Sequence, residues 1–161
     1  MATPTNLPAA QTTGNVLTAA YVNDLRGAFR ILQVVQTNYN TITASASTTF
    51  VDTGLTATIT PQSSSSKIFV LLNQSLYVDT AVAEMSYRLV RGSTTLDTQL
   101  APIFSTGGAI VGQGIYNYLD SPATASAVTY KTQICRQTGG GTVYANINNN
   151  VSRITLFEVS A

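Results

Sequence analysis

The sequence contains no histidine and no tryptophan, and it has a single cysteine, Cys135. Histidine is the commonest general base and the commonest transition-metal ligand, so its absence argues against conventional nucleophile–base catalysis and against most metal sites. One cysteine cannot form an intrachain disulfide. Without a base to generate its thiolate, Cys135 is interpreted as a small apolar side chain on a strand.

Charge is also scarce, at 9% of the 161 residues with a net charge of +1. Soluble domains usually carry about 25% charged residues. No basic run is present, so we expect no nucleic-acid partner. The longest purely apolar run, Ile68 to Leu72, is far too short to cross a membrane, so we expect no membrane partner. Residues 1–14 lack the charged and apolar regions of a secretory signal, and we expect assembly in the cytoplasm.

The carboxylates are too scattered for a recognisable active site. No two of the seven fall at the close spacing of an acidic motif: Asp24, Asp52, Asp79, Glu84, Asp97, Asp120 and Glu158. A pair brought together from distant strands is the one enzymatic arrangement left open. We therefore expect a protein that is not an enzyme, with no catalytic residues, no cofactor and no metal.

Uncharged polar residues replace the missing charge, with 25 Thr, 14 Ser, 11 Asn and 9 Gln. Threonine is β-branched and suits a pleated surface. Alternating patterns predict strands near residues 33–37, 40–51, 55–60, 67–79, 84–91, 94–98, 114–120, 126–137, 142–148 and 152–159. Turn signals such as DTG at 52–54 and STGG at 105–108 separate them. Within 126–137, the alternation places Tyr130 and Ile134 on one face and Lys131 and Gln133 on the other. Many short strands with regular turns favour a mainly β fold, a jelly-roll-like antiparallel β-sandwich.

One segment, residues 14–33, has the period of a helix. Its apolar stripe consists of Leu17, Tyr21, Val22, Leu25, Phe29 and Leu32. A helix this short is marginal alone, so the stripe must pack on the body, on other copies or on a partner. Ahead of it lies a polar stretch containing Pro4 and Pro8, expected to be extended. We divide the chain into an N-terminal arm and attachment helix, 1–33, and a β-sandwich head, 34–161.

The predicted last strand is apolar on both sides. Ile154 and Leu156 point to one face, whereas Phe157 and Val159 point to the other. Such a strand is covered on both faces. Either it is a central strand under a loop, or one face joins the core and Phe157 and Val159 form an oligomer interface.

Tyr116 and Tyr118 flank Asn117 on a predicted strand and are candidate receptor contacts. Exposed tyrosine rings can stack on sugars, although such residues more often pack in a core or at its rim. The glycine-containing loop at 105–114 is a second candidate for a receptor site.

Three segments carry a resemblance to a known family. The stretch GNVLTAAYVNDL resembles the leader G-x-V-L-T-A-A-x-x-N found near the start of many tailed-phage virion proteins. Residues 48–72, TTFVDTGLTATITPQSSSSKIFVLL, look like a segment of structural proteins from phages of aquatic bacteria, including cyanophages. The ending SRITLFEVSA resembles their usual last strand. Together the segments cover about a third of the chain.

The resemblance implies a homotrimeric β-sandwich on the virion surface, attached by its N-terminal segment to the major capsid protein or to tail or vertex proteins. It carries no catalytic residues. Fibre proteins usually have a long shaft between anchor and head, and no shaft is evident here. A capsid decoration, or cement, protein is therefore favoured over a tail-fibre or head-fibre component that binds a host receptor.

Overall fold

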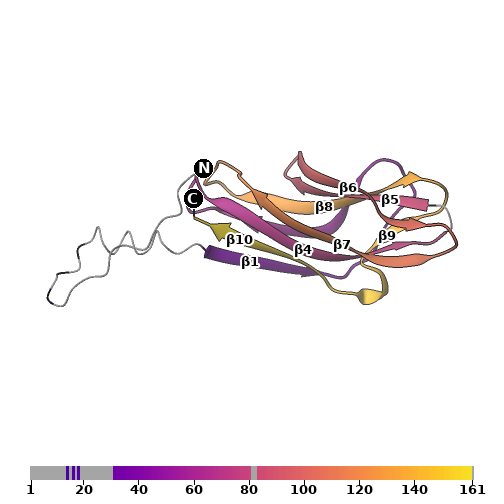
Figure 1. Cartoon of the computed structure of the whole chain (residues 1–161), viewed down its shortest axis with the longest axis horizontal. Coiled ribbons are helices and arrows are strands. Elements are labelled where there is room, and N and C mark those ends of the chain that lie inside the picture. Colours follow the sequence, from indigo (N-terminus) through magenta and orange to yellow (C-terminus); the bar gives the residue numbers. More distant parts are fainter. Residues whose placement is uncertain (1–13, 15, 17, 19–30, 81–82, 161) are drawn as a thin grey trace.

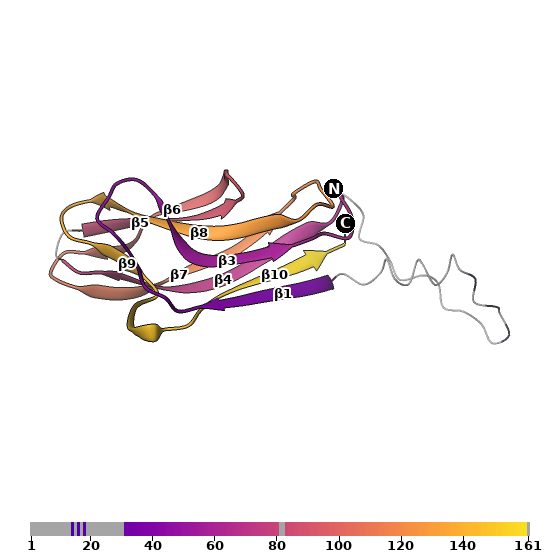
Figure 2. The same cartoon turned by 180° about the vertical axis from the view of Figure 1, so that it is seen from behind.

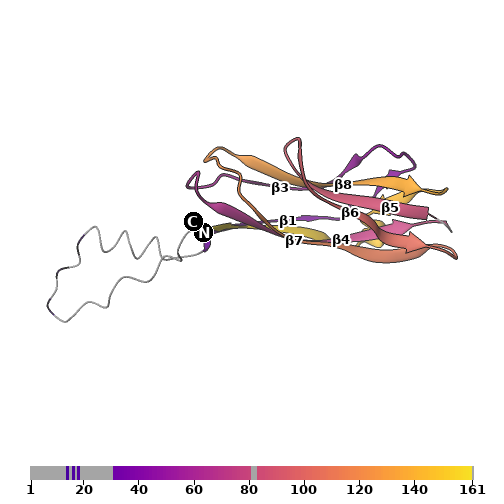
Figure 3. The same cartoon turned by 45° about the horizontal axis from the view of Figure 1, so that its top comes forward.

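The protein is a sandwich of two antiparallel β-sheets, seen as two layers in Figure 3. The computed structural model describes residues 14, 16, 18, 31–80 and 83–160. In chain order the elements are β1 (Ile31–Tyr39), β2 (Thr43–Ser45), β3 (Val51–Ile59), β4 (Lys67–Val78), β5 (Ala83–Arg91), β6 (Thr94–Ser105), β7 (Ile110–Asp120), β8 (Val128–Thr138), β9 (Val143–Ala145), the short 3-10 helix η1 (Ile147–Asn149) and β10 (Ser152–Val159).

The strand order identifies the predicted jelly roll. One sheet has six strands, with β1, β10 and β4 side by side, β7 on the far side of β4, and the short β9 and β2 beyond the end of β10. The other has four strands in the order β3-β8-β5-β6. The chain crosses between the sheets at every connection between long strands except the β5–β6 hairpin, and the resulting orders β1-β10-β4-β7 and β3-β8-β5-β6 are those of a jelly roll. The prediction of a mainly β, jelly-roll-like sandwich is confirmed.

The two ends of the sandwich are distinct (Figures 1 and 2). β1 begins and β10 finishes at one end, because Ile31 pairs with Val159 in an antiparallel ladder. We call this the proximal end, and the loop between β3 and β4 lies there as well. The connections from β6 to β7 and from β8 to β9 lie at the opposite, distal end. Whatever precedes Ile31 is therefore joined to the proximal end.

The core lies between the sheets and is built from alternate side chains of each long strand. In β4, for example, Ile68, Val70, Leu72 and Leu76 point inward and are almost completely buried. Each such side chain contributes about 1.5–3 kcal/mol by leaving water. The prediction that Tyr130 and Ile134 share one face of β8 is confirmed, since both are fully buried.

A polar bridge crosses this core at Gln74, whose side chain is fully buried on β4. Its Oε1 accepts hydrogen bonds from Tyr87 Oη at 3.0 Å and from Thr132 Oγ1 at 2.6 Å, both on the four-stranded sheet. Its Nε2 donates to Asn146 Oδ1 at 3.0 Å. Asn146 in turn donates from Nδ2 to the carbonyl oxygen of Thr41 at 2.9 Å. Gln74 therefore joins the two sheets and the connection between β1 and β2.

Several predicted boundaries are wrong: β6 and β7 are longer than predicted, β9 is shorter, and three further differences have identifiable causes. Residues 31–33 begin β1 instead of closing a helix, because Ile31 to Tyr39 pair with β10. The predicted strand 40–51 is mostly loop, containing the three-residue β2. DTG at 52–54 is a bulge inside β3, not a turn: the register with β8 shifts between Asp52 and Thr56, and Gly54 has φ +85. The Tyr39 ring packs against Gly54, where no Cβ would fit.

Glu158 fastens the proximal end. Its carboxylate is buried on the inner side of β10, accepting hydrogen bonds from Gln33 Nε2 at 2.6 Å and from the Gln62 backbone N–H at 2.7 Å. Burial alone would raise the pKa of Glu158, but the hydrogen bonds from Gln33, Ser66 and Gln62 outweigh it and lower the pKa. The ionised carboxylate thus ties β1 and the β3–β4 loop to β10.

We expect Gln74→Ala to lower the free energy of unfolding by about 3 kcal/mol, because Tyr87, Thr132 and Asn146 would lose a buried partner and a cavity would remain. Gln113→Ala is the matched control, since Gln113 is exposed on the neighbouring strand β7. Urea denaturation measures both. Equal stability of the two variants would show that the bridge does not hold the sheets together.

We expect acid to weaken the wild type more than Glu158→Gln. A carboxyl group whose folded-state pKa is lowered stabilises the fold above its ordinary pKa of 4.5, and this contribution is lost as the pH falls through the folded-state pKa. The free energy of unfolding should therefore differ between the two proteins at pH 7 and converge in acid. Parallel pH profiles would contradict the assignment.

Candidate interaction face

The outward surface of the four-stranded sheet is polar over β3 and β8, where its groups bond to one another, whereas Leu100 and Phe104 are exposed on its edge strand β6. Asp52 accepts hydrogen bonds from Lys131 Nζ at 2.8 Å and from Gln133 Nε2 at 2.5 Å. Arg88 Nε donates to Gln133 Oε1 at 2.6 Å, and its guanidinium lies 3.9 Å from the centre of the Phe50 ring. Burial alone would raise the pKa of Asp52, but the bonds from Lys131 and Gln133 lower it. These polar groups are satisfied without a partner.

The outward surface of the six-stranded sheet is different, and we call it the apolar face. Apolar side chains point outward from its four long strands, β1, β10, β4 and β7. They are Ile31, Val34, Phe157, Val159, Phe69, Leu71, Val111, Ile115 and Leu119. Towards the distal end, the rings of Tyr77 and Tyr144 continue the surface with centroids 5.4 Å apart. An apolar surface of this extent is typical of an interaction site.

The strand register aligns the largest of these side chains in one row. Val34 pairs with Phe157, Phe157 with Phe69, and Phe69 with Leu119. The two phenylalanine rings are tilted against each other with centroids 6.2 Å apart, on the two central strands. At the ends of the row, Val34 and Leu119 are each 53% exposed. The row therefore has an aromatic centre flanked by accessible aliphatic side chains.

β7 contributes to this face because its pattern is inverted. Gly112 and Gly114 point into the sandwich, where Ile103 and Tyr87 occupy the space that a Cβ would need. The bulkier Val111, Ile115 and Leu119 lie on the other side of the strand. At Gly112 and Gly114 the strand is therefore small inside and aliphatic outside, the reverse of an ordinary half-buried strand, whereas further along it Tyr116 and Tyr118 point inward. This strand is thus built to present apolar groups outward.

The structure brings together only some of the predicted interface residues. Phe157 and Val159 lie on the apolar face, with Ile154 and Leu156 opposite them in the core. Leu32 lies in β1, not in a helix. The other members of the predicted stripe lie outside the described residues: Leu17, Tyr21, Val22, Leu25 and Phe29.

Sequence reasoning missed most of the apolar face. Ile31, Val34, Phe69, Leu71, Ile115 and Leu119 were not predicted to belong to an interface. A signal was present in the apolar run Ile68 to Leu72, since five consecutive apolar residues on a strand place side chains on both faces.

Of the two alternatives open for Tyr116 and Tyr118, the structure shows packing in the core and at its rim. Both point inward from β7, and Tyr116 is only 3% exposed. Tyr116 Oη donates to the carbonyl oxygen of Tyr87 at 2.9 Å. Burial, with the nearby charge of Asp97, raises the pKa of Tyr116 well above its ordinary value. Tyr118 packs against the edge of the core.

The carboxylates of the described residues serve the fold. Asp120 accepts from Arg91 and from Tyr130 Oη, both at 2.6 Å, and Asp79 accepts from the Thr142 backbone N–H at 2.8 Å. Within the described part of the chain, no three His, Cys, Asp or Glu side chains gather to hold a metal. Nor does that part contain a helix with the length and hydropathy needed to span a membrane.

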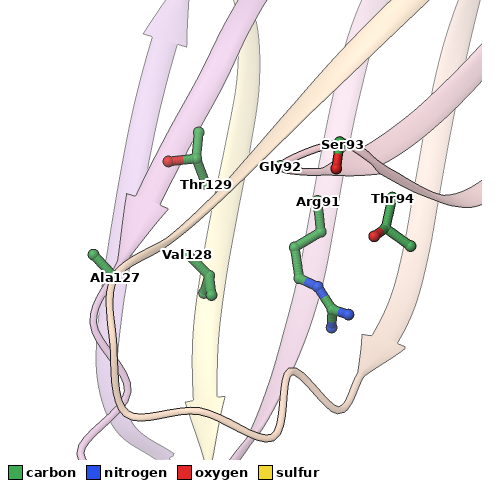
Figure 4. Close-up of a pocket in the computed structure, with 7 residues that line it drawn as sticks. All are labelled: Arg91, Gly92, Ser93, Thr94, Ala127, Val128 and Thr129. Carbon is green, nitrogen blue, oxygen red and sulfur yellow. The ribbon is translucent and has the colours of Figure 1, made fainter.

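A small hollow opens beside the β5–β6 turn (Figure 4). It is lined by Arg91, Gly92, Ser93, Thr94, Ala127, Val128 and Thr129. The only charged group there is the Arg91 guanidinium, which is engaged by Asp120 at 2.6 Å. The hollow therefore offers no free charge to a ligand, and the apolar face is the stronger candidate site.

Comparison with known proteins identifies the fold but no family. No protein-family model and no curated protein matches the sequence. Among solved structures, the VP2 subviral particle of infectious bursal disease virus is similar, with 10% identity and a TM-score of 0.52. The match covers 80% of this chain but only 32% of VP2, so the chain spans about a third of that protein.

Two further solved structures are more distant. The Gt strain structure of infectious bursal disease virus has 10% identity and a TM-score of 0.43, over 80% of this chain and 38% of that one. The insecticidal delta-endotoxin Cry8Ea1 of Bacillus thuringiensis has 14% identity and a TM-score of 0.36, over 77% of this chain and 19% of the toxin.

We expect Tyr116→Phe to lower the free energy of unfolding by about 1 kcal/mol, because the inward hydroxyl loses its bond to the Tyr87 carbonyl. Thermal or urea unfolding measures the change. A variant as stable as the wild type would mean that the hydroxyl does not support the core.

Proposed function

We propose that this protein is a non-enzymatic structural component of a virus particle, a homotrimer attached by its N-terminal segment, and that it decorates the capsid. The observation that carries the proposal is the apolar face on one side of a jelly roll whose other side is polar except along the edge strand β6. Such a molecule is suited to packing against protein.

The fold is compatible with this role. Double-sheet jelly rolls occur in viral capsid proteins, although lectin domains and other proteins share them. VP2 of infectious bursal disease virus, which forms a subviral particle, has a similar fold. The resemblance of residues 14–25, 48–72 and 152–161 to tailed-phage virion proteins supports a phage particle in particular.

Composition supports a structural role over an enzymatic one. The chain has no histidine, and the carboxylates of Asp52, Asp120 and Glu158 are each held by hydrogen bonds from neighbouring strands or loops. A charged fraction of only 9% lets copies approach one another and a capsid surface with little repulsion.

A fibre component that binds a host receptor is the second candidate. The observation in its favour is at the distal end, where Phe104 and Ile110 are exposed on either side of the glycine-containing loop 106–109. The copy number in purified particles separates the two roles. A decoration protein covers the shell in many copies, whereas a fibre is present only at the tail or vertices.

We expect deletion of residues 1–30 to leave a folded head that no longer attaches to particles, because both sheets of the described structure are built from residues between Ile31 and Val159. Co-sedimentation with particles that lack the protein measures attachment, and circular dichroism confirms folding. Deletion should stop before Ile31, since removing residues 31–33 would cut into β1.

Two full-length variants test whether the apolar stripe predicted in residues 14–33 makes the attachment. The double change Val22→Ser and Phe29→Ser should abolish co-sedimentation, whereas Asn23→Ser, on the polar side of the predicted helix, should retain it. Full attachment of either the deletion variant or the double variant would show that another surface holds the protein to the particle.

A further inference from the structure

We propose that the apolar face is the surface through which copies of this chain pack together, chiefly through the row Val34, Phe157, Phe69 and Leu119 near its proximal end. This inference rests on the proposed function, which requires an assembled protein, and it names where the copies meet. The partner is therefore a second copy of the same chain.

The size of the face fits such a contact. β4 has 12 residues, and a strand of that length is about 40 Å long. The neighbouring strands β1, β10 and β7 have 9, 8 and 11 residues, so with strands about 4.8 Å apart the four present about 650 Å² of sheet surface. A stable protein–protein interface buries about 1,200–2,000 Å² in total, counting both partners. One face of one sheet is thus comparable in area with one partner's share of a small interface.

The chemistry of the face fits an identical partner. The only charged side chains that point outward from its long strands are Lys67, near the proximal end, and Arg153, two rows from Phe157. The row of Val34, Phe157, Phe69 and Leu119 is wholly apolar. On its distal side the next two rows are mixed: Gln36, Thr155 and Asn117 lie beside Leu71, and Asn38, Arg153 and Asn73 lie beside Ile115. An apolar core bordered by polar groups is the usual anatomy of an interface.

The chain's own N-terminal segment is too small to cover this face. Even wound completely as a helix, residues 14–30 would be about 26 Å long and about 10 Å across, covering about two fifths of the surface. The remaining leader is polar and rich in proline and threonine. A segment of this composition would leave most of Ile115, Leu119 or Val34 in water.

The opposite side of the sandwich supplies the control. Its charged and polar groups, such as Asp52 with Lys131, are already paired within the chain. A new lysine there should meet only solvent. A new lysine on the apolar face would instead be buried without a partner at the contact between copies.

The test compares Leu119→Lys and Leu71→Lys with Thr58→Lys in the full-length protein. Leu119 and Leu71 are outward and partly exposed on β7 and β4, whereas Thr58 is exposed on β3 of the other sheet. Light scattering or sedimentation measures mass, and circular dichroism with urea unfolding confirms that each variant keeps the native fold. Because all three substituted side chains point outward, folding should survive.

We expect the wild type and Thr58→Lys to have a mass of about 51 kDa, three chains of 17.0 kDa. Leu119→Lys and Leu71→Lys should fall threefold in mass, to the single chain. A folded wild type that is monomeric at all concentrations overturns the proposal. So do apolar-face variants that keep the wild-type mass, because the copies would then meet elsewhere.

Limited proteolysis tests the alternative that the chain's own N-terminal segment covers the apolar face. If residues 15–30 covered the face of their own chain, the wild type would be a monomer and Leu119→Lys would expose that segment to cleavage. That outcome overturns the inference.

Two further outcomes distinguish the contact from the proposed function. If Leu119→Lys dissociates an assembled wild type, but the protein is absent from purified particles, the contact is upheld and the proposed function is refuted. A dimer dissociated by the same change upholds the contact and refutes the trimer.

Discussion

The buried amide of Gln74 is the constraint on which the sandwich depends. Two sheets packed only through aliphatic side chains can slide, because apolar contacts have little directional preference. Hydrogen bonds to Tyr87, Thr132 and Asn146 fix the position of β4 relative to the other sheet and to the loop that holds Asn146. No buried side-chain nitrogen or oxygen among the described residues is left without a partner. With the interior so defined, the outward positions of every strand are defined too.

Much of the fold follows from the sequence, because strand period and turn residues are local properties. The bounds of β4 and β10 were predicted to within one residue. Each is an apolar-rich segment bounded by Ser or Asn residues, a pattern that strongly favours a strand. The apolar nature of both sides of β10 was visible as well. Alternation in β8 correctly separated Tyr130 and Ile134 from Lys131 and Gln133.

Features that depend on distant contacts could not be predicted. Gly54 resembles a turn residue, and only the Tyr39 ring packed against it explains why the chain continues as a bulged strand. In β7, a reader of the pattern would place Ile115 and Leu119 in the core, whereas the inward glycines accommodate Ile103 and Tyr87 from other strands. The alternation of side chains along a strand shows which residues share a face, but it does not show which face points into the core. The apolar face became visible only once the register of four strands was known.

The pairing of β1 with β10 also determines how the head would respond to mechanical load. A pull on the chain ahead of Ile31, resisted at the distal end, acts along the axis of β1. The inter-strand hydrogen bonds of an antiparallel ladder lie across that axis, so the load is shared among all the pairs from Ile31 to Tyr39. The strand is sheared as a unit and cannot be peeled away one bond at a time. A head tethered through its first strand in this way is joined to its support by the geometry that resists rupture best.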